Sequence, residues 1–350
     1  MTIKYKLIPT LKGFRDFFGL FYTRFLTIIA CFNLLVSVTH SEENKPLITV
    51  IQIIDHPSAN AVREGIKKSL EELGYTDGKT IRWIYKNPQG NSATNIQIAQ
   101  QFVSMNPDIM VAIATPSAQA LVSAARKSNI PIVFAAVTDP INAGLVKDLK
   151  KPGDFVTGVS DFPPLERQVT LIKKMLPHAK IIGGIYNPGE INSVKQFKLF
   201  EALAKKEGFE VLSATAIKTS DVHAAALSLI KKVDAFYIPL DNTVLSAMDS
   251  LIKLQFDFQK PIFTSETDSV LQGALATAGA HLFDIGKSAG KMVARILQGE
   301  NVGDIAIETA RVSKITVNMK TLSSLNLKLP EDTDFNIEKI GLEGSLNQER

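Results

Sequence analysis

Ile109-Met110-Val111-Ala112-Ile113-Ala114-Thr115-Pro116-Ser117 is the stretch that decides the fold of this chain of 350 residues. An apolar run ends in a polar, proline-marked turn, and we expect a helix to follow directly at 117–126. The run is apolar at every position, which is typical of a parallel strand covered by helices on both faces. The stretch therefore predicts one strand–helix unit of an α/β protein.

Three further turns of this kind follow apolar runs, at 135–140, 184–190 and 238–243. In a parallel sheet such turns lie at the carboxyl ends of the strands, which is the edge where open α/β folds bind ligands. Two of the four turns belong to the first half of the chain and two belong to the second. We therefore expect two lobes whose polar strand ends face a shared cleft.

Strand-like and helix-like segments alternate from residue 47 onward, in two series of similar length. Strands are expected at 47–54, 81–85, 109–114, 132–137, 156–160, 181–186, 210–214, 235–239, 261–264, 273–279 and 314–318. Helices are expected at 60–73, 93–105, 117–126, 165–175, 191–206, 221–231, 244–256 and 282–297. Such alternation predicts an α/β protein with two doubly wound parallel-sheet lobes.

The expected domain boundaries follow from this pattern. They are a signal peptide at 1–41, an N-terminal lobe at 46–155 plus 274–308, a C-terminal lobe at 156–272 plus 309–330, and a polar tail at 331–350. The chain should cross between the lobes near 153–155, 272–273 and 309–312, so that three connecting strands form a hinge.

The charge is unevenly distributed. The chain has 39 Lys and Arg against 35 Asp and Glu, a net charge of +4. Residues 1–40 hold five basic residues and one acidic residue, so the same +4 lies there and the remainder carries 34 of each sign. Because a nucleic-acid binder keeps its basic excess on the folded domain, this distribution excludes nucleic acid as the expected partner.

The N-terminal stretch resembles an export signal. A basic region precedes an apolar run at 25–38, and polar residues at 39–43 would form a cleavage zone. A retained membrane anchor is the alternative, whereas a lipoprotein-type signal ending at Cys31 is disfavoured because apolar residues continue after it. Cys31 is the only cysteine, so the mature chain would have no disulfide, thiol nucleophile or cysteine-ligated metal.

Polar residues at the four turns are the candidate ligand contacts. Thr115 and Ser117 precede a helix whose free amide groups and dipole favour a carboxylate or a phosphate. Asp241 and Glu190 could each bind a ligand ammonium group. His56 follows the first strand, which makes it the histidine best placed to contact a ligand. Simple helix capping is the competing interpretation for Thr115, Ser117 and Asp241.

Motifs for catalysis are missing from the sequence. It has no Gly-x-Ser-x-Gly elbow and no Gly-x-Gly-x-x-Gly after a strand. Gly286-Lys287-Ser288 resembles the end of a phosphate loop, but His281 stands where the first glycine is required. The other histidines share no metal-ligand spacing. We therefore expect no catalytic residues, no metal and no cofactor.

Taken in order, the turns resemble the substrate-binding proteins of ABC transporters, of the branch associated with tryptophan, tyrosine and related ligands, on the type 1 periplasmic-binding fold. The matching pieces span about 47–330 and are His56-Pro57, Ala114 to Ala120, Phe134 to Pro140 with Ala143 to Val146, Pro152-Gly153 with Thr157 to Asp161, Tyr186 to Glu190 with Asn192-Ser193, Asp241 to Val244, and Gly273 to Thr277. In relatives an acid is expected shortly after His-Pro, whereas 58–60 are Ser, Ala and Asn here. A different amino acid or a small non-amino-acid ligand therefore stays open.

The resemblance implies an exported, monomeric receptor that hands a small ligand, an amino acid, to an ABC permease with its ATPase. For an α-amino acid it implies that Thr115, Ser117 and the Ala118 amide hold the carboxylate, and that Asp241 or Glu190 holds the ammonium group. The remaining cleft residues would be His56, Thr138, Asp139, Tyr186, Asn187, Ser193, Asn242 and Thr243. Tyr186, Phe162 and Phe134 are the candidates for stacking on a ligand side chain.

Two other classes of protein stay open from the sequence alone. The same fold serves as the sensor half of transcriptional repressors, although those carry a helix-turn-helix where this chain has an apolar run. A doubly wound enzyme acting on a nucleotide or a sugar is the other alternative, disfavoured by the missing motifs.

Overall fold

The structure is a computed structural model that describes residues 45–153, 155–312, 314–330 and 335–341. The expected signal peptide, including Cys31, lies outside the described residues. From Leu47 onward the chain belongs to one compact unit, which contains two β-sheets. Each sheet with its helices is called a lobe below.

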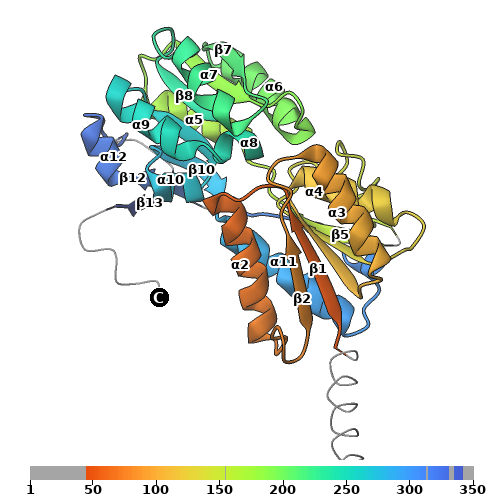
Figure 1. Cartoon of the computed structure of the whole chain (residues 1–350). Coiled ribbons are helices and arrows are strands. Elements are labelled where there is room, and N and C mark those ends of the chain that lie inside the picture. The colour runs from red at the N-terminus through yellow and green to blue at the C-terminus, as the bar shows by residue number, and fades with distance from the viewer. Residues whose placement is uncertain (1–44, 154, 313, 331–334, 342–350) are drawn as a thin grey trace, which may run out of the picture. The chain divides into compact units, whose positions relative to one another are not determined.

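The first lobe is built on a parallel sheet (Figure 1). Its neighbouring strands are, in order, β2 (Arg82–Lys86), β1 (Leu47–Gln52), β3 (Ile109–Ile113), β4 (Ile132–Ala135), β5 (Val156–Ser160) and β11 (Glu308–Thr309). Its helices are α2 (Pro57–Glu72), α3 (Ser92–Ser104), α4 (Thr115–Ala125) and α11 (Leu282–Leu297). A short 3-10 helix, Val302–Asp304, precedes β11.

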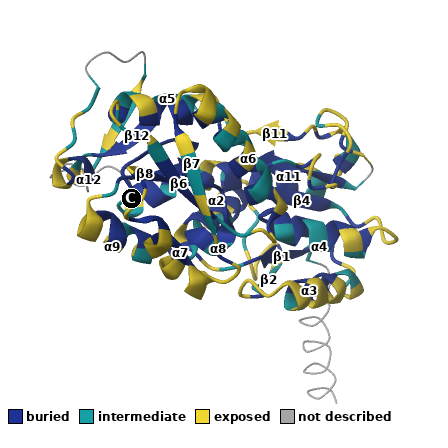
Figure 2. Ribbon diagram, turned by 90° about the horizontal axis from the view of Figure 1, so that it is seen from above, coloured by how far each residue is buried: buried dark blue, intermediate teal, exposed yellow. Residues whose placement is uncertain are grey.

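Both faces of this sheet are covered, as the continuous apolar runs predicted. Ile48 and Val50 of β1 pack with α2 and α11, whereas Ile51 packs on the opposite face with α3 and α4. Successive strand residues point to opposite faces, so a strand between two helical layers must be apolar throughout. Figure 2 shows the central strands buried and the outer helix faces exposed.

The second lobe contains a mixed sheet. Its neighbouring strands are, in order, β13 (Ile337–Ile340), β12 (Ile315–Asn318), β10 (Ala276–Ala280), β9 (Ile262–Glu266), β8 (Ala235–Ile238), β6 (Ile181–Tyr186) and β7 (Glu210–Thr215). All neighbours pair in parallel except β10 and β12. The strand expected at 314–318 is β12, which runs antiparallel to β10 and parallel to β13.

Helices again cover both faces of the second sheet. α5 (Leu165–Met175) and α6 (Ile191–Lys206) pack on one face, and α7 (Val222–Leu229), α8 (Asn242–Leu245) and α9 (Met248–Phe258) pack on the other. The single helix expected at 244–256 is thus two helices. The remaining helices are a 3-10 helix at Thr219–Asp221, α10 (Asp268–Gln272) and α12 (Met319–Ser324).

Three strands lie in a different place from the one expected. β5 pairs with β4 in the first sheet, although residue 156 was expected to open the second lobe. β10 pairs with β9 in the second sheet, although 274–308 was assigned to the first lobe. β13 extends the second sheet through β12, within the segment expected to be only a polar tail. The segments at 153–155 and 272–273 therefore precede strands of the lobe that the chain has not yet left.

The chain crosses between the two sheets where these strands end. It passes from β5 to α5, returns from β10 to α11, and passes again from β11 to β12. The first two crossings thus follow β5 and β10, at residues 161–164 and at His281, rather than preceding them. The third lies after Thr309, where it was expected.

Helices α2 and α11 pack unusually closely through glycines. An added Cβ at Gly65 would lie 2.1 Å from the Phe283 carbonyl oxygen, and one at Gly286 would lie 2.1 Å from the Val62 carbonyl oxygen. At Gly290 it would lie 2.7 Å from the Ile66 carbonyl oxygen. Gly286 therefore serves helix packing and not a phosphate loop.

Candidate functional site

A small cavity lies between the carboxyl edges of the two sheets. The first lobe contributes the polar residues His56, Thr138 and Asp161, and the second contributes Asn192 and Asn242. The volume is about 20 Å³. Such a space holds about one water molecule, so the lobes lie close together in this structure.

Aliphatic side chains form the remaining wall of this interlobe cavity. They are Val62 of α2, Ile113 of β3, Leu282 of α11, and Leu240 and Leu245 of the second lobe. An apolar wall with a few convergent polar groups is the usual composition of a small-molecule site.

His56 is held in one tautomer by the start of α2. It is the N-cap residue, and its Nδ1 accepts the Ala59 N–H at 3.3 Å. Burial lowers the pKa of His56 to about 4, so the ring is neutral and its proton resides on Nε2. Nε2 has no hydrogen-bond partner within bonding geometry. The side chain of Asn242, from the other lobe, lies close enough to raise the pKa of His56 slightly against the effect of burial. His56 thus offers a buried donor to the cavity.

Asp161 lies immediately after β5, at the first crossing between the lobes. Burial raises the pKa of its carboxyl group to about 7, while the Thr138 side chain opposes the shift by hydrogen bonding. Its Oδ1 is buried and has no partner. A buried carboxyl oxygen without a partner is costly, which makes Asp161 a strong candidate for a ligand contact.

Asn192 approaches the cavity from the first turn of α6. Its Nδ2 donates to the Leu240 carbonyl oxygen at 2.7 Å, which fixes the orientation of the amide. The opposite atom, Oδ1, is buried without a partner. The second lobe therefore presents an unpaired acceptor to the same space.

The N-terminus of α4 lies beside the cavity through Ala114, which lines it. Ala114 is the N-cap residue, has φ 74°, and supplies no capping side chain. The hydroxyls of Thr115 and Ser117 are buried and unpaired. The helix start thus retains donors for an anion.

The Ala118 amide is different, because it donates to the Ala114 carbonyl oxygen at 3.1 Å in the first helical turn. The resemblance implied that this amide holds a ligand carboxylate, whereas in this structure it is paired within the helix.

Glu190 is fully occupied within the second lobe. Its Oε2 accepts the backbone N–H and the Nδ2 of Asn242, at 3.0 and 2.6 Å. Its Oε1 accepts the backbone N–H and the hydroxyl of Thr243, at 3.0 and 2.9 Å. Four donors leave no oxygen of this carboxylate for a ligand ammonium group.

Asp241 is also committed to the local fold. Its Oδ1 accepts the Val244 N–H at 2.9 Å as the cap of α8, and its Oδ2 accepts the Asn187 N–H at 2.6 Å. Burial and the adjacent Glu190 carboxylate raise its pKa well above the usual range, and the Ser193 hydroxyl lies beside it. The expectation that Asp241 or Glu190 receives the ligand's ammonium group does not fit this network.

Other expected contacts lie behind the cavity or away from it. Asn187 donates to the Thr243 hydroxyl at 2.8 Å and so belongs to the Glu190 network. Tyr186 stacks on Phe197 with ring centroids 5.0 Å apart, and Phe134 is buried in the core of the first lobe. Asp139 accepts the Asn142 N–H within a turn. None of these residues lines the cavity, and Phe162 does not line it either.

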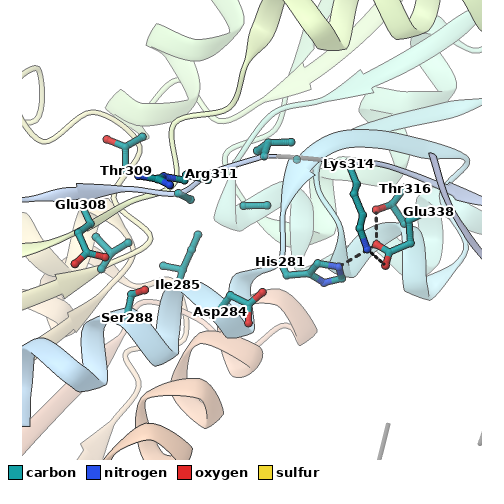
Figure 3. Close-up of a pocket in the computed structure, with 15 residues that line it drawn as sticks. His281, Asp284, Ile285, Ser288, Glu308, Thr309, Arg311, Lys314, Thr316 and Glu338 are labelled. Atoms are coloured by element: carbon teal, nitrogen blue, oxygen red, sulfur yellow. Dashed lines mark hydrogen bonds and ion pairs between the residues drawn. The ribbon is translucent and has the colours of Figure 1, made fainter. Parts of the chain in front are cut away.

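A larger cavity of about 850 Å³ lies at the crossings themselves. Figure 3 shows that His281 and Lys314 pair with Glu338 on one side of this cavity, while Arg311 and Glu308 lie on its other side. These charged groups are exposed or only half-buried, and among the described lining residues no buried polar atom lacks a partner. The smaller cavity has three residues with such atoms. We therefore take the smaller cavity as the candidate site.

A buried acid pair links the end of β9 to the start of α11. Glu266 accepts the backbone N–H of Ser269 at 3.0 Å, and Asp268 accepts the Leu282 N–H at 3.2 Å. Burial and the neighbouring Asp268 carboxyl raise the pKa of Glu266 to about 8. Glu266 is therefore protonated at neutral pH, and unfolding releases its proton.

We expect Glu266→Gln to flatten the dependence of stability on pH. Because the pKa of Glu266 rises from 4.5 to about 8 on folding, its contribution is complete below pH 4.5 and is lost as the pH rises through 8. One proton corresponds to a slope of at most about 1.4 kcal/mol per pH unit. Urea denaturation between these pH values would measure it, with exposed Glu71→Gln as the control. An unchanged slope in Glu266→Gln would contradict the assignment.

The described residues contain neither a metal-binding cluster nor a membrane-spanning helix. No group of three or more His, Cys, Asp or Glu side chains in this part of the chain is arranged to hold a metal ion. No helix there is both long and apolar enough to cross a membrane.

Asp161 and Asn192 are the site residues that sequence reasoning missed. Both belong to the pieces that carried the family resemblance, but neither was singled out as a ligand contact. Assigning β5 to the second lobe concealed Asp161, because a residue at the carboxyl end of a first-sheet strand would have been grouped with Thr115 and Thr138. For Asn192 the signal was its position in the first turn of α6.

Comparison with known proteins decides the family. A family model described as ABC transporter substrate binding protein matches residues 47–337. The chain belongs to this family. Its members are binding proteins and not enzymes, and the two-lobed architecture is the type 1 periplasmic-binding fold that the resemblance implied.

Several relatives are close in sequence. The chain is 40% identical over 290 residues to the tyrosine-binding protein of Clostridioides difficile, which covers 83% of each chain. A Streptococcus pneumonia domain in complex with L-Trp is 36% identical with a TM-score of 0.78, covering 82% of this chain and 97% of that one. The ligand-free, open structure of a Clostridium difficile substrate-binding protein is 37% identical with a TM-score of 0.62, covering 84% and 99%.

Proposed function

We propose that this protein is the exported receptor of an ABC importer and binds an aromatic α-amino acid in the interlobe cavity. The observation that carries the proposal is the set of unpaired buried atoms around that cavity, namely His56 Nε2, Asp161 Oδ1 and Asn192 Oδ1. Buried polar groups in native proteins are nearly always hydrogen-bonded, so these atoms await a partner. The two lobes contribute to the set, which fits a ligand held between them.

The apolar wall supports a ligand with a large, nonpolar side chain. Leu282 and Val62 from one lobe face the same space as Leu240 and Leu245 from the other. The relatives named for tyrosine and bound to L-Trp favour an aromatic side chain. Because no aromatic residue of the described part of the chain apart from His56 lines the cavity, the ligand ring would pack on aliphatic groups and not stack on Phe134 or Tyr186.

Domain closure is part of this proposal, and the size of the cavity supports it. A space of about 20 Å³ cannot hold an amino acid, so the lobes would have to separate for a ligand to enter and would lie farther apart around it than they do here. The TM-score of 0.78 to the L-Trp complex, against 0.62 to the open ligand-free relative at nearly equal identity, supports a closed arrangement here. Opening would take place at the three crossings.

Aromatic amino acids are expected to stabilise the purified protein against heat. A ligand at 100 times its Kd adds about 2.7 kcal/mol to the free energy of unfolding, which for a chain of this size raises Tm by several degrees. L-Tyrosine, L-tryptophan and L-phenylalanine should give this shift in a thermal melt. L-Alanine and L-glutamate are the controls, since neither fills an apolar wall. No shift with any of the three aromatic amino acids would contradict the proposal.

The transport role rests on family membership and on the export-like sequence at 25–38. We propose that the protein acts as a monomer outside the cytoplasmic membrane and delivers its ligand to a permease driven by an ATPase. Fractionation of cells should place it with the envelope. Recovery from the cytosol, retained on DNA, would favour a regulatory protein instead.

A further inference from the structure

The polar atoms around the interlobe cavity differ in the ligand group they can accept. His56 Nε2 carries a hydrogen because Nδ1 accepts the Ala59 N–H, so it offers a donor. Asp161 Oδ1 and Asn192 Oδ1 offer acceptors, the second because its amide nitrogen is already bound to Leu240. The cavity therefore has a donor side that begins with His56 and an acceptor side made of Asp161 and Asn192.

The donor side continues into the start of α4. The Thr115 and Ser117 hydroxyls there are buried and unpaired, next to Ala114 on the cavity wall. These groups suit the carboxylate of an amino acid. The ammonium group then needs acceptors elsewhere, because Glu190 already accepts four hydrogen bonds from Asn242 and Thr243. Each oxygen of Asp241 already accepts a backbone N–H, and Asp241 does not line the cavity.

We propose that Asp161 and Asn192 form the ammonium subsite, with Asp161 selecting ligands that carry a cationic amine. This inference rests on the proposed function and deepens it. Asp161 is 7% exposed and Asn192 is 4% exposed. The two residues line one cavity from opposite lobes, and each has a buried oxygen without a partner. An ammonium group donates three hydrogen bonds, so it can engage both oxygens together.

The position of Asp161 gives this subsite a second consequence. Asp161 ends β5 at the first crossing, and Asn192 begins α6 in the other lobe. An ammonium group between them joins the two lobes next to the hinge. Burial raises the pKa of Asp161 to about 7, so the empty, closed cavity disfavours the carboxylate until a cation arrives. Ligand binding and closure are therefore coupled through one contact.

The test compares each amino acid with an analogue that lacks only the amine. L-Tryptophan is paired with indole-3-propionate, and L-tyrosine with 3-(4-hydroxyphenyl)propionate, in calorimetric titrations of the full protein. Asp161→Asn keeps the shape of the side chain and removes its charge. We expect Asp161→Asn to weaken the affinity for L-tryptophan and for L-tyrosine by about 100-fold, because a hydrogen bond to a charged group is lost. Affinity for the analogues should change less than about threefold, the scale of an ordinary surface substitution.

Asp249→Asn is the matched control, since it makes the same substitution at an exposed position of α9 that does not line the cavity. It should leave all four affinities unchanged. Equal losses for amino acids and analogues in Asp161→Asn would mean that Asp161 only supports the structure, and an unchanged affinity for L-tryptophan would mean that it makes no contact. Either outcome overturns the subsite while leaving the proposed function intact. If the wild-type protein bound neither amino acid, the proposed function itself would be wrong.

Discussion

Replacing Gly286 with alanine is expected to lower the free energy of unfolding by about 3 kcal/mol, the upper end of the usual cost of overpacking. The added Cβ would lie 2.1 Å from the Val62 carbonyl oxygen and 3.0 Å from the Gly65 Cα, both of which are backbone atoms. A side chain could rotate away, but backbone atoms can yield only if helices α2 and α11 move apart. That movement would open the core of the first lobe, because both helices pack on the same face of its sheet.

Intrinsic helix propensity predicts the opposite sign. Alanine inside a helix is favoured over glycine by about 1 kcal/mol. Urea denaturation of Gly286→Ala therefore separates packing from propensity. Lys291→Ala, on the exposed side of the same helix, is the control and should change stability by less than about 0.5 kcal/mol. A Gly286→Ala protein as stable as the wild type would show that the close approach of α2 and α11 is not required.

Glu190→Ala is expected to cost about 3 kcal/mol of stability and to weaken ligand binding. The change leaves the backbone N–H groups of Asn242 and Thr243 and both of their side-chain donors without the acceptor they share. Buried donors left unpaired cost about 1–3 kcal/mol each, and relief of the repulsion with Asp241 offsets part of that. Binding should suffer because Asn242 lines the cavity.

Denaturation and calorimetric titration would measure the two effects of Glu190→Ala. Glu190→Gln should lie between Glu190→Ala and the wild type, because one carbonyl oxygen remains as an acceptor. Glu201→Ala removes a half-exposed carboxylate from α6 that forms an ion pair with Lys205 at 2.9 Å, and should be close to neutral. If Glu190→Ala lost affinity for L-tryptophan without losing stability, Glu190 would contact the ligand directly and our description of it would be wrong.

Much of the architecture was predictable because the local signals agreed with one another. The helices at 165–175, 191–206 and 282–297 and the strands at 156–160 and 181–186 occur where periodicity and turn residues placed them. The prediction of a single helix at 244–256 was wrong, because Asp241 caps a short helix that ends before Ala247 and a second helix begins at Met248. Periodicity alone cannot detect such a break.

The candidate site was predictable only in part. His56, Thr138 and Asn242 line the cavity as expected, since each follows the end of a strand. Glu190 and Asp241 have the same sequence signature, yet they are held inside the second lobe by hydrogen bonds to residues far away in the chain. Whether an acid at a strand end faces a ligand or caps a neighbouring helix depends on those partners.

The sequence by itself determined that this chain forms two α/β lobes with polar strand ends, because apolar runs and turns are local features that fix strands, helices and the carboxyl edge of a sheet. The tertiary structure decided which sheet β5 and β10 join and which polar groups remain unpaired. Strand partnership and hydrogen-bond saturation depend on residues distant in sequence, such as Glu190 with Asn242 and Asp268 with Leu282. Asp161 is a candidate binding residue only in the folded chain, where its Oδ1 is buried without a partner.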